Sequence, residues 1–152
     1  MPSSSEFNPS LLDILHTLRN CERVIDGELR QRSESLKSAR DARSAGDSEA
    51  VTRFLSYLSD RERRLSDWSY ERAHCLTKLP RLLAQTTHPT AIFDALALLE
   101  QIVSRLEGQA AHFRSTGSLD EADTYDERAK PYRDARADLL ANCALYRASP
   151  LH

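Results

Sequence analysis

The amino-acid sequence predicts an all-α protein, an up-down-up-down four-helix bundle built from two antiparallel helical hairpins. The 152 residues include 22 leucines but only seven valines and isoleucines together, and leucine favours helices whereas β-branched residues favour strands. Apolar residues recur every three or four positions, which is the period of a helix with one buried face. Four glycines and six prolines are too few for a disordered or collagen-like chain.

The first predicted helix begins at Asn8-Pro9-Ser10, where a capping residue is followed closely by proline, and it runs to about Ala45. Gly46 then ends it, because glycine readily adopts the left-handed conformation that closes many helices. The apolar positions of this helix are Leu11, Leu15, Leu18, Cys21, Val24, Ile25, Leu29 and Leu36.

The second predicted helix begins after Asp47 and Ser48, both residue types that cap helix starts, and runs to about Ala84. Pro80 lies near its end, where it should bend or loosen the last turn without dividing the domain. The apolar positions are Val51, Leu55, Leu58, Leu65, Leu76, Leu79 and Leu83.

The third predicted helix carries the clearest pattern in the chain. It follows the segment 86–89, Thr-Thr-His-Pro, in which Thr87 is the expected cap. Its apolar residues step by four and three without a break, as in the seam of a coiled coil. They are Ile92, Leu96, Leu99, Val103, Leu106, Ala110 and Phe113.

Gly117 should end the third helix, and Ser118 should cap the fourth, with Glu121 completing a capping box. Pro131 is expected to kink this helix, and Arg136 interrupts its apolar row. The row itself is Ala122, Tyr125, Ala129, Tyr132, Leu139, Cys143 and Tyr146.

These helices predict one helical domain over residues 9–148, made of a hairpin at 9–85 and a shorter hairpin at 89–148. Residues 1–8 are expected to form a flexible tail and residues 149–152 a frayed end. Because the first hairpin is longer, its tip near Gly46 should extend past the second and leave apolar residues uncovered. An exposed apolar patch usually marks an interface. The predicted partner-binding residues are Leu36, Val51, Phe54, Leu55, Tyr57 and Leu58.

Charged residues at 30–34 and 59–64 form a polar belt between this tip and the rest of the first hairpin. The belt has two interpretations. We expect two solvated faces held by weak pairs within each helix, Asp60 with Arg64 and Glu28 with Arg32. The alternative is a device that fixes the register of the hairpin, or a docking site for a partner.

The sequence predicts no catalytic residues, no cofactor-binding residues and no metal ligands. Glu71 and His74 form one Glu-x-x-His element, but carboxylate-bridged metal bundles use two. His74 and Cys75 are consecutive, so a helix points them about 100° apart and they cannot form a nucleophile and base. Phosphate-binding and dinucleotide-binding glycine motifs are absent. A surface pair is the expected role of Glu71 and His74.

Charge and cysteine content limit the compartment and the partners. The formal net charge is −2, which gives no general attraction to nucleic acid or to anionic membranes. Three cysteines outside any Cys-x-x-Cys pair suit a reducing, cytoplasmic compartment. We expect neither a secretory leader nor a transmembrane segment, since the apolar runs fall far short of about 20 residues.

The sequence therefore favours a non-enzymatic interaction module, an adaptor, scaffold or assembly subunit, that binds a partner helix or self-associates. One alternative is a membrane-surface module that uses the basic flank of the first hairpin, which consists of Arg30, Arg32, Lys37, Arg40, Arg43, Arg61, Arg63 and Arg64. A second alternative is a metal-binding bundle based on Glu71 and His74.

Overall fold

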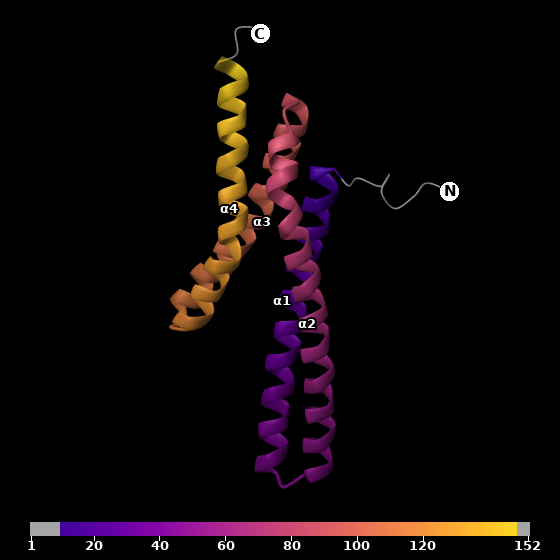
Figure 1. Cartoon of the computed structure of the whole chain (residues 1–152). Coiled ribbons are helices and arrows are strands. Elements are labelled where there is room, and N and C mark those ends of the chain that lie inside the picture. The colour runs from indigo at the N-terminus through magenta and orange to yellow at the C-terminus, as the bar shows by residue number, and fades with distance from the viewer. Residues whose placement is uncertain (1–9, 149–152) are drawn as a thin grey trace, which may run out of the picture. The chain divides into compact units, whose positions relative to one another are not determined.

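The chain forms four helices in a computed structural model that describes residues 10–148, with side chains described as far as residue 143 (Figure 1). Helices account for 93% of these residues and no strand occurs among them. The predicted all-α bundle is thus confirmed. The predicted tail at 1–8 and frayed end at 149–152 lie outside the described residues. The helices are α1 (Leu11–Ser44), α2 (Ser48–Gln85), α3 (Pro89–Ser115) and α4 (Leu119–Ala148).

The described residues divide into two compact units. The first contains the residues of α1 up to Arg19, those of α2 from Cys75 onward, and the whole of α3 and α4. The second is Asn20–His74, the rest of the α1–α2 hairpin. Helices α1 and α2 each contribute to both units, so the two units share two continuous helices.

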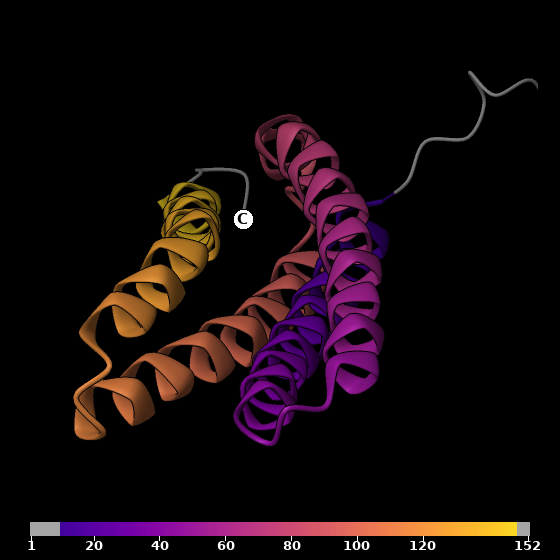
Figure 2. The same cartoon turned by 90° about the horizontal axis from the view of Figure 1, so that it is seen from below.

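The first unit is a four-helix bundle with a leucine-rich core, and successive helices run in opposite directions (Figures 1 and 2). Each of its four helices supplies buried side chains, because each presents one apolar face at helical spacing. Large members of this core include Leu15, Leu18, Leu79, Leu83, Leu99, Ile102, Leu106, Tyr132 and Leu139.

The predicted seam of α3 is buried as expected, with Leu96 and Phe113 only partly covered. The buried face is wider than a coiled-coil seam, because Ala95, Leu98 and Ile102 are buried as well. A helix that packs in a bundle against more than one neighbour needs this broader apolar stripe.

Helix α4 buries the predicted row from Ala122 to Leu139, and Cys143 is partly buried; the side chain of Tyr146 lies outside the described residues. Figure 1 shows α4 changing direction along its length, and Pro131 lies inside it. A proline removes one backbone donor, and near it the Arg133 guanidinium donates to the Asp126 carbonyl at 3.2 Å.

Both hairpin corners use glycine as predicted. Gly46 and Gly117 have φ angles of +74° and +83°, the left-handed conformation that glycine adopts without steric cost. In each corner the next residue donates its backbone N–H to a carbonyl five positions earlier: Asp47 to Ala42 at 3.0 Å, and Ser118 to Phe113 at 2.8 Å. These bonds define Schellman motifs.

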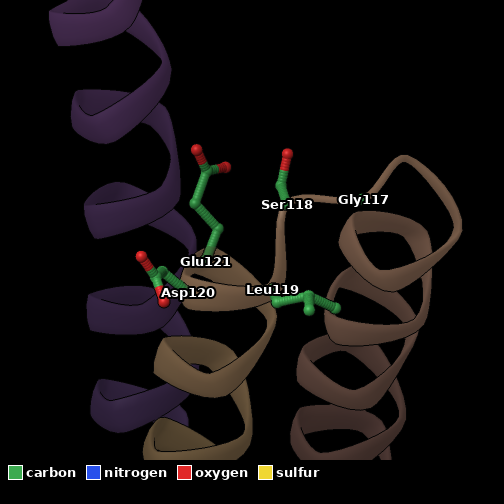
Figure 3. A pocket seen from close by; sticks show the side chains of 5 residues that line it. All are labelled: Gly117, Ser118, Leu119, Asp120 and Glu121. Carbon is green, nitrogen blue, oxygen red and sulfur yellow. The ribbon is translucent and has the colours of Figure 1, made fainter.

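The helix starts that follow these corners are also where the sequence places them. The Asp47 carboxylate accepts a hydrogen bond from the Ala50 backbone at 3.1 Å, so Asp47 caps α2. Figure 3 shows the side chains of Ser118 and Glu121 rising from the same side of the first turn of α4. The reciprocal bonds of a capping box there stay a prediction.

The predicted cap of α3 was wrong by one residue. His88, not Thr87, is the N-cap: its backbone is extended, and its Nδ1 accepts from the Thr90 backbone N–H at 3.3 Å. Pro89 is the reason, because proline favours the first helical position and forces the preceding residue out of the helical region. Upstream, the Thr86 hydroxyl donates to the Leu82 carbonyl at 2.7 Å.

A reciprocal cap also closes the start of α1, where Ser10 and Asp13 form a capping box. The Ser10 backbone N–H donates to the Asp13 carboxylate at 3.0 Å, and the Asp13 N–H donates to the Ser10 hydroxyl oxygen at 3.2 Å. The backbone N–H of Ser10, followed by its side chain, lowers the pKa of Asp13. The stabilisation from this contact is complete above the unfolded-state pKa and is lost as pH falls through the folded-state pKa.

We expect carboxyl NMR titration to show the pKa of Asp13 below its ordinary value. Changing Ser10→Ala should move this pKa only part of the way back, because the backbone donor remains. An unshifted Asp13 in the wild-type protein would contradict the capping box.

Candidate partner-binding site

The second unit is an antiparallel hairpin whose tip is closed by small residues. Its buried side chains near Gly46 are the alanines at 39, 42 and 50, while larger buried residues, Ile25 and Leu65, lie further from the tip. Alanine allows two helix backbones to approach closely. Large apolar side chains near the tip are therefore left at the edges of the helix pair or outside it.

The six predicted partner-binding residues divide into exposed and partly buried members. Leu36, Leu55 and Tyr57 are 39%, 54% and 47% exposed. Val51, Phe54 and Leu58 are partly buried. We call this set the tip patch: Leu36, Val51, Phe54, Leu55, Tyr57 and Leu58. Three of its six apolar side chains are thus accessible to another molecule.

The aromatic part of the tip patch has a defined geometry. The Phe54 and Tyr57 rings lie one helical turn apart and meet edge to face, with centroids 6.0 Å apart and planes at 73°. The Arg53 guanidinium carbon lies 5.4 Å from the centroid of the Phe54 ring, within the range of a cation–π contact. These contacts restrict the side-chain freedom that binding would otherwise remove.

Most side chains of the polar belt are exposed, as expected, but the expected pairs of Asp60 with Arg64 and Glu28 with Arg32 are not the ones that form. Arg63 pairs with Asp60 within α2, and the other pairs run between the helices. Arg61 binds Glu28 at 3.0 Å, and Arg64 reaches the same carboxylate at 4.0 Å. Arg32 binds Glu62 at 3.0 Å. The partners lie at nearly equal distances from Gly46 along the chain, so these pairs agree with the antiparallel register of the hairpin.

The sequence did not indicate a deeper ion pair in the same hairpin. Glu22 is 1% exposed, and its carboxylate binds the Arg72 guanidinium across the two helices. Asp26, one turn further along α1, is also buried. The signal available in the sequence was the occurrence of Glu22 and Asp26 beside Cys21 and Ile25, where a helical wheel places acidic residues on the apolar face.

Three observations bear on the two alternative functions, metal binding by Glu71 and His74 and membrane binding by the basic flank. His74 stacks on Tyr70 with the ring planes 2° apart and the centroids at 6.4 Å. Within residues 10–148 no group of three or more His, Cys, Asp or Glu side chains is arranged to hold a metal ion. On the basic flank, Arg32, Arg61 and Arg64 are engaged with glutamates, which reduces the charge available to an anionic membrane.

A shallow hollow in the first unit lies where α4 begins (Figure 3). The helix start itself explains its acidic residues, because carboxylates in the first turn are favoured by the helix dipole. One turn later, Asp126 pairs with Arg114 of α3 and so ties the corner together. The hollow is lined by Gly117, Ser118, Leu119, Asp120 and Glu121.

Comparison with protein-family models, curated proteins and solved structures found no match to this chain. None of the helices in the described part of the chain has an apolar stretch long enough to cross a lipid bilayer. The tip patch and the cross-helix ion pairs beside it are the features of the second unit that bear on function.

Proposed function

We propose that this chain is a non-enzymatic interaction module whose tip patch binds an amphipathic helix of another protein. The observation that carries the proposal is the exposure of Leu36, Leu55 and Tyr57 on one helical hairpin. Exposed apolar side chains that gather on a folded domain usually mark an interface. Tyr57 and the neighbouring Phe54 form the aromatic side of the tip patch, whereas Leu55, two residues before Tyr57, points about 200° away around α2. Tyrosine and arginine, both present at the tip, are enriched among the residues that dominate binding energies.

The first unit indicates why a helix fits the tip patch. There, side chains of α1 and α2 share a core with side chains of α3 and α4, so this hairpin buries apolar residues against further helices. A partner helix with apolar residues at positions i, i+3, i+4 and i+7 would offer the same kind of surface. The cross-helix ion pairs bring the two helices together beside the tip patch, and a partner helix would order the alanine-lined end further.

Photo-cross-linking from the tip patch tests this proposal. A photoreactive phenylalanine analogue at position 57 should cross-link, in native extract, to an amphipathic helical segment of another protein. Position 70 is the matched control, because Tyr70 lies on the same helix and in the same unit and is 74% exposed. Cross-linking from position 70 should be weak.

The variant Phe54→Ser removes the ring beside position 57 and should reduce the cross-link yield there at least tenfold, as expected for removal of about 1.5–3 kcal/mol of apolar contact. Helicity should be unchanged because Phe54 is only partly buried. Equal cross-linking from positions 57 and 70, or products linking only copies of this chain, would reject a partner helix at the tip patch.

A further inference from the structure

Helix α3 has a second face, opposite its buried seam, on which a large aromatic side chain is exposed. Phe93 is 72% exposed. At about 100° per residue, Glu100 and Gln101 lie at the middle of the same face, and its other residues are small. Gly108 is one of these, and a Cβ added there would meet nothing within 4 Å. We call this face the α3 outer face: Thr90, Phe93, Ala97, Ser104, Gly108 and Ala111, all exposed.

The longer polar side chains beside the α3 outer face are held away from its centre. Glu100 binds Arg136 of α4 at 2.8 Å, and Gln101 accepts a hydrogen bond from Arg19 of α1 at 2.9 Å. The Ser104 hydroxyl donates to Glu100 at 3.3 Å, so covering Ser104 would not leave its hydroxyl without a partner. The side chains at the centre of the face are consequently short or turned aside, and their polar groups already have hydrogen-bond partners.

The α3 outer face is complementary to itself. In an antiparallel pair of α3 helices centred between Glu100 and Gln101, Phe93 of each helix lies level with Gly108 of the other. In the same register Ala97 lies level with Ser104, and Thr90 with Ala111. The bulky ring therefore meets the position without a side chain, and small residues meet small residues, which permits close approach of the backbones.

The charges beside this face agree with the same pairing. Asp94 and Arg105 lie on the same flank of α3, and a two-fold axis brings that flank of one helix beside the same flank of the other. Asp94 then lies level with Glu107 of the second copy, which is on the other flank and pairs with Arg133 of its own chain, and about two residues from Arg105 of the second copy. The Glu100 carboxylates near the axis already bind Arg136, which limits their mutual repulsion.

We propose that two copies of this chain associate through the α3 outer face as an antiparallel, two-fold symmetric dimer, with Phe93 of each copy packed over Gly108 of the other. A two-fold interface uses the same surface on both subunits, and this face satisfies that requirement in size and in charge. The dimer uses the first unit and leaves the tip patch of the second unit out of its interface.

Light scattering after size exclusion, across a dilution series, tests the dimer. The wild-type chain should be dimeric, and Phe93→Ser should raise the dimer dissociation constant at least about a hundredfold, because each dimer loses two aromatic contacts. Leu140→Ser is the control, since Leu140 is 52% exposed on α4; it should leave the dimer intact. A wild-type chain that is monomeric throughout the series would overturn the proposal.

Gly108→Leu separates a role in the dimer from a role in the fold. The monomer has space for the new side chain, and leucine favours the helix more than glycine. The variant should therefore unfold at a higher temperature as a monomer and yet fail to dimerise. A variant that still dimerises with wild-type affinity would overturn the proposed packing.

Cysteine cross-linking tests the antiparallel register, with Cys143→Ser as background and the buried Cys21 and Cys75 left in place. Oxidation should link the double variant Ala97→Cys, Ser104→Cys into a dimer. It should not link Ala97→Cys alone, because the two copies of position 97 lie seven residues apart, about 10 Å along the pair, beyond disulfide reach. Efficient linkage of the single variant would overturn the antiparallel arrangement.

The two proposals fail independently. The tip variant Phe54→Ser should leave the dimer unchanged, and Phe93→Ser should leave cross-linking of a partner helix at position 57 unchanged. Loss of the dimer on Phe54→Ser, with Phe93→Ser without effect, would place self-association at the tip patch and overturn the α3 dimer.

Discussion

Changing Arg72→Met lowers the free energy of unfolding by about 3–5 kcal/mol, because it leaves the carboxylate of Glu22 buried without its guanidinium. The methionine keeps most of the aliphatic volume, so the loss reports the charge and not the packing. Trp68, the single tryptophan, lies in the same unit, and its fluorescence during urea unfolding reports the change. A loss below about 1 kcal/mol would contradict a buried ion pair.

Two comparisons isolate the buried charge. Arg63→Met removes an arginine of the same helix that is exposed and pairs with Asp60 at 3.8 Å, and it should cost no more than about 0.5 kcal/mol. The double variant Glu22→Leu, Arg72→Met should recover at least half of the loss caused by Arg72→Met alone, because a buried ion pair can be replaced by apolar side chains. Failure to recover would indicate that packing, not charge, dominates.

Leu99→Ala should destabilise the first unit by about 3–5 kcal/mol, because it removes buried apolar volume and leaves a cavity in a close-packed core. Leu99 is fully buried at the middle of the α3 seam, among side chains from all four helices. Thermal unfolding followed by circular dichroism measures the loss.

Leu140→Ala is the matched control, since the same chemical change occurs on the exposed side of α4. It should cost less than about 1 kcal/mol. Similar losses for Leu99→Ala and Leu140→Ala would contradict the assignment of the core face of these helices.

The fold was predictable from the sequence because helix period and helix punctuation are local properties. Gly46 and Gly117 end their helices for a reason contained in glycine itself, and the α3 seam is visible as spacing alone. Thr87 was mistaken for a cap because threonine is a good capping residue. The restriction that Pro89 imposes on its predecessor was the stronger local effect and should have selected His88.

The ion pairs around the candidate site were harder to predict from the sequence than the exposure of its apolar residues. The longer first hairpin predicts an uncovered apolar tip, and Leu36, Leu55 and Tyr57 are exposed there; that this tip binds a partner stays a prediction. The cross-helix pairs of Glu28 and Arg32 depend on how the two helices face each other, and charge runs read along one helix cannot supply that information. The pairing of Glu22 with Arg72 also depends on tertiary contact across 50 positions.

The alanines that close the end of the α1–α2 hairpin affect how tightly a molecule can bind there. Each contributes less burial than a leucine would, so this end opens locally at a smaller free-energy cost than the leucine core around α3. A molecule that binds there must restrict the motion of this end of the hairpin, and the entropy lost in doing so lowers its affinity. A complex formed at this end of the hairpin is therefore expected to be weak and reversible, not permanent.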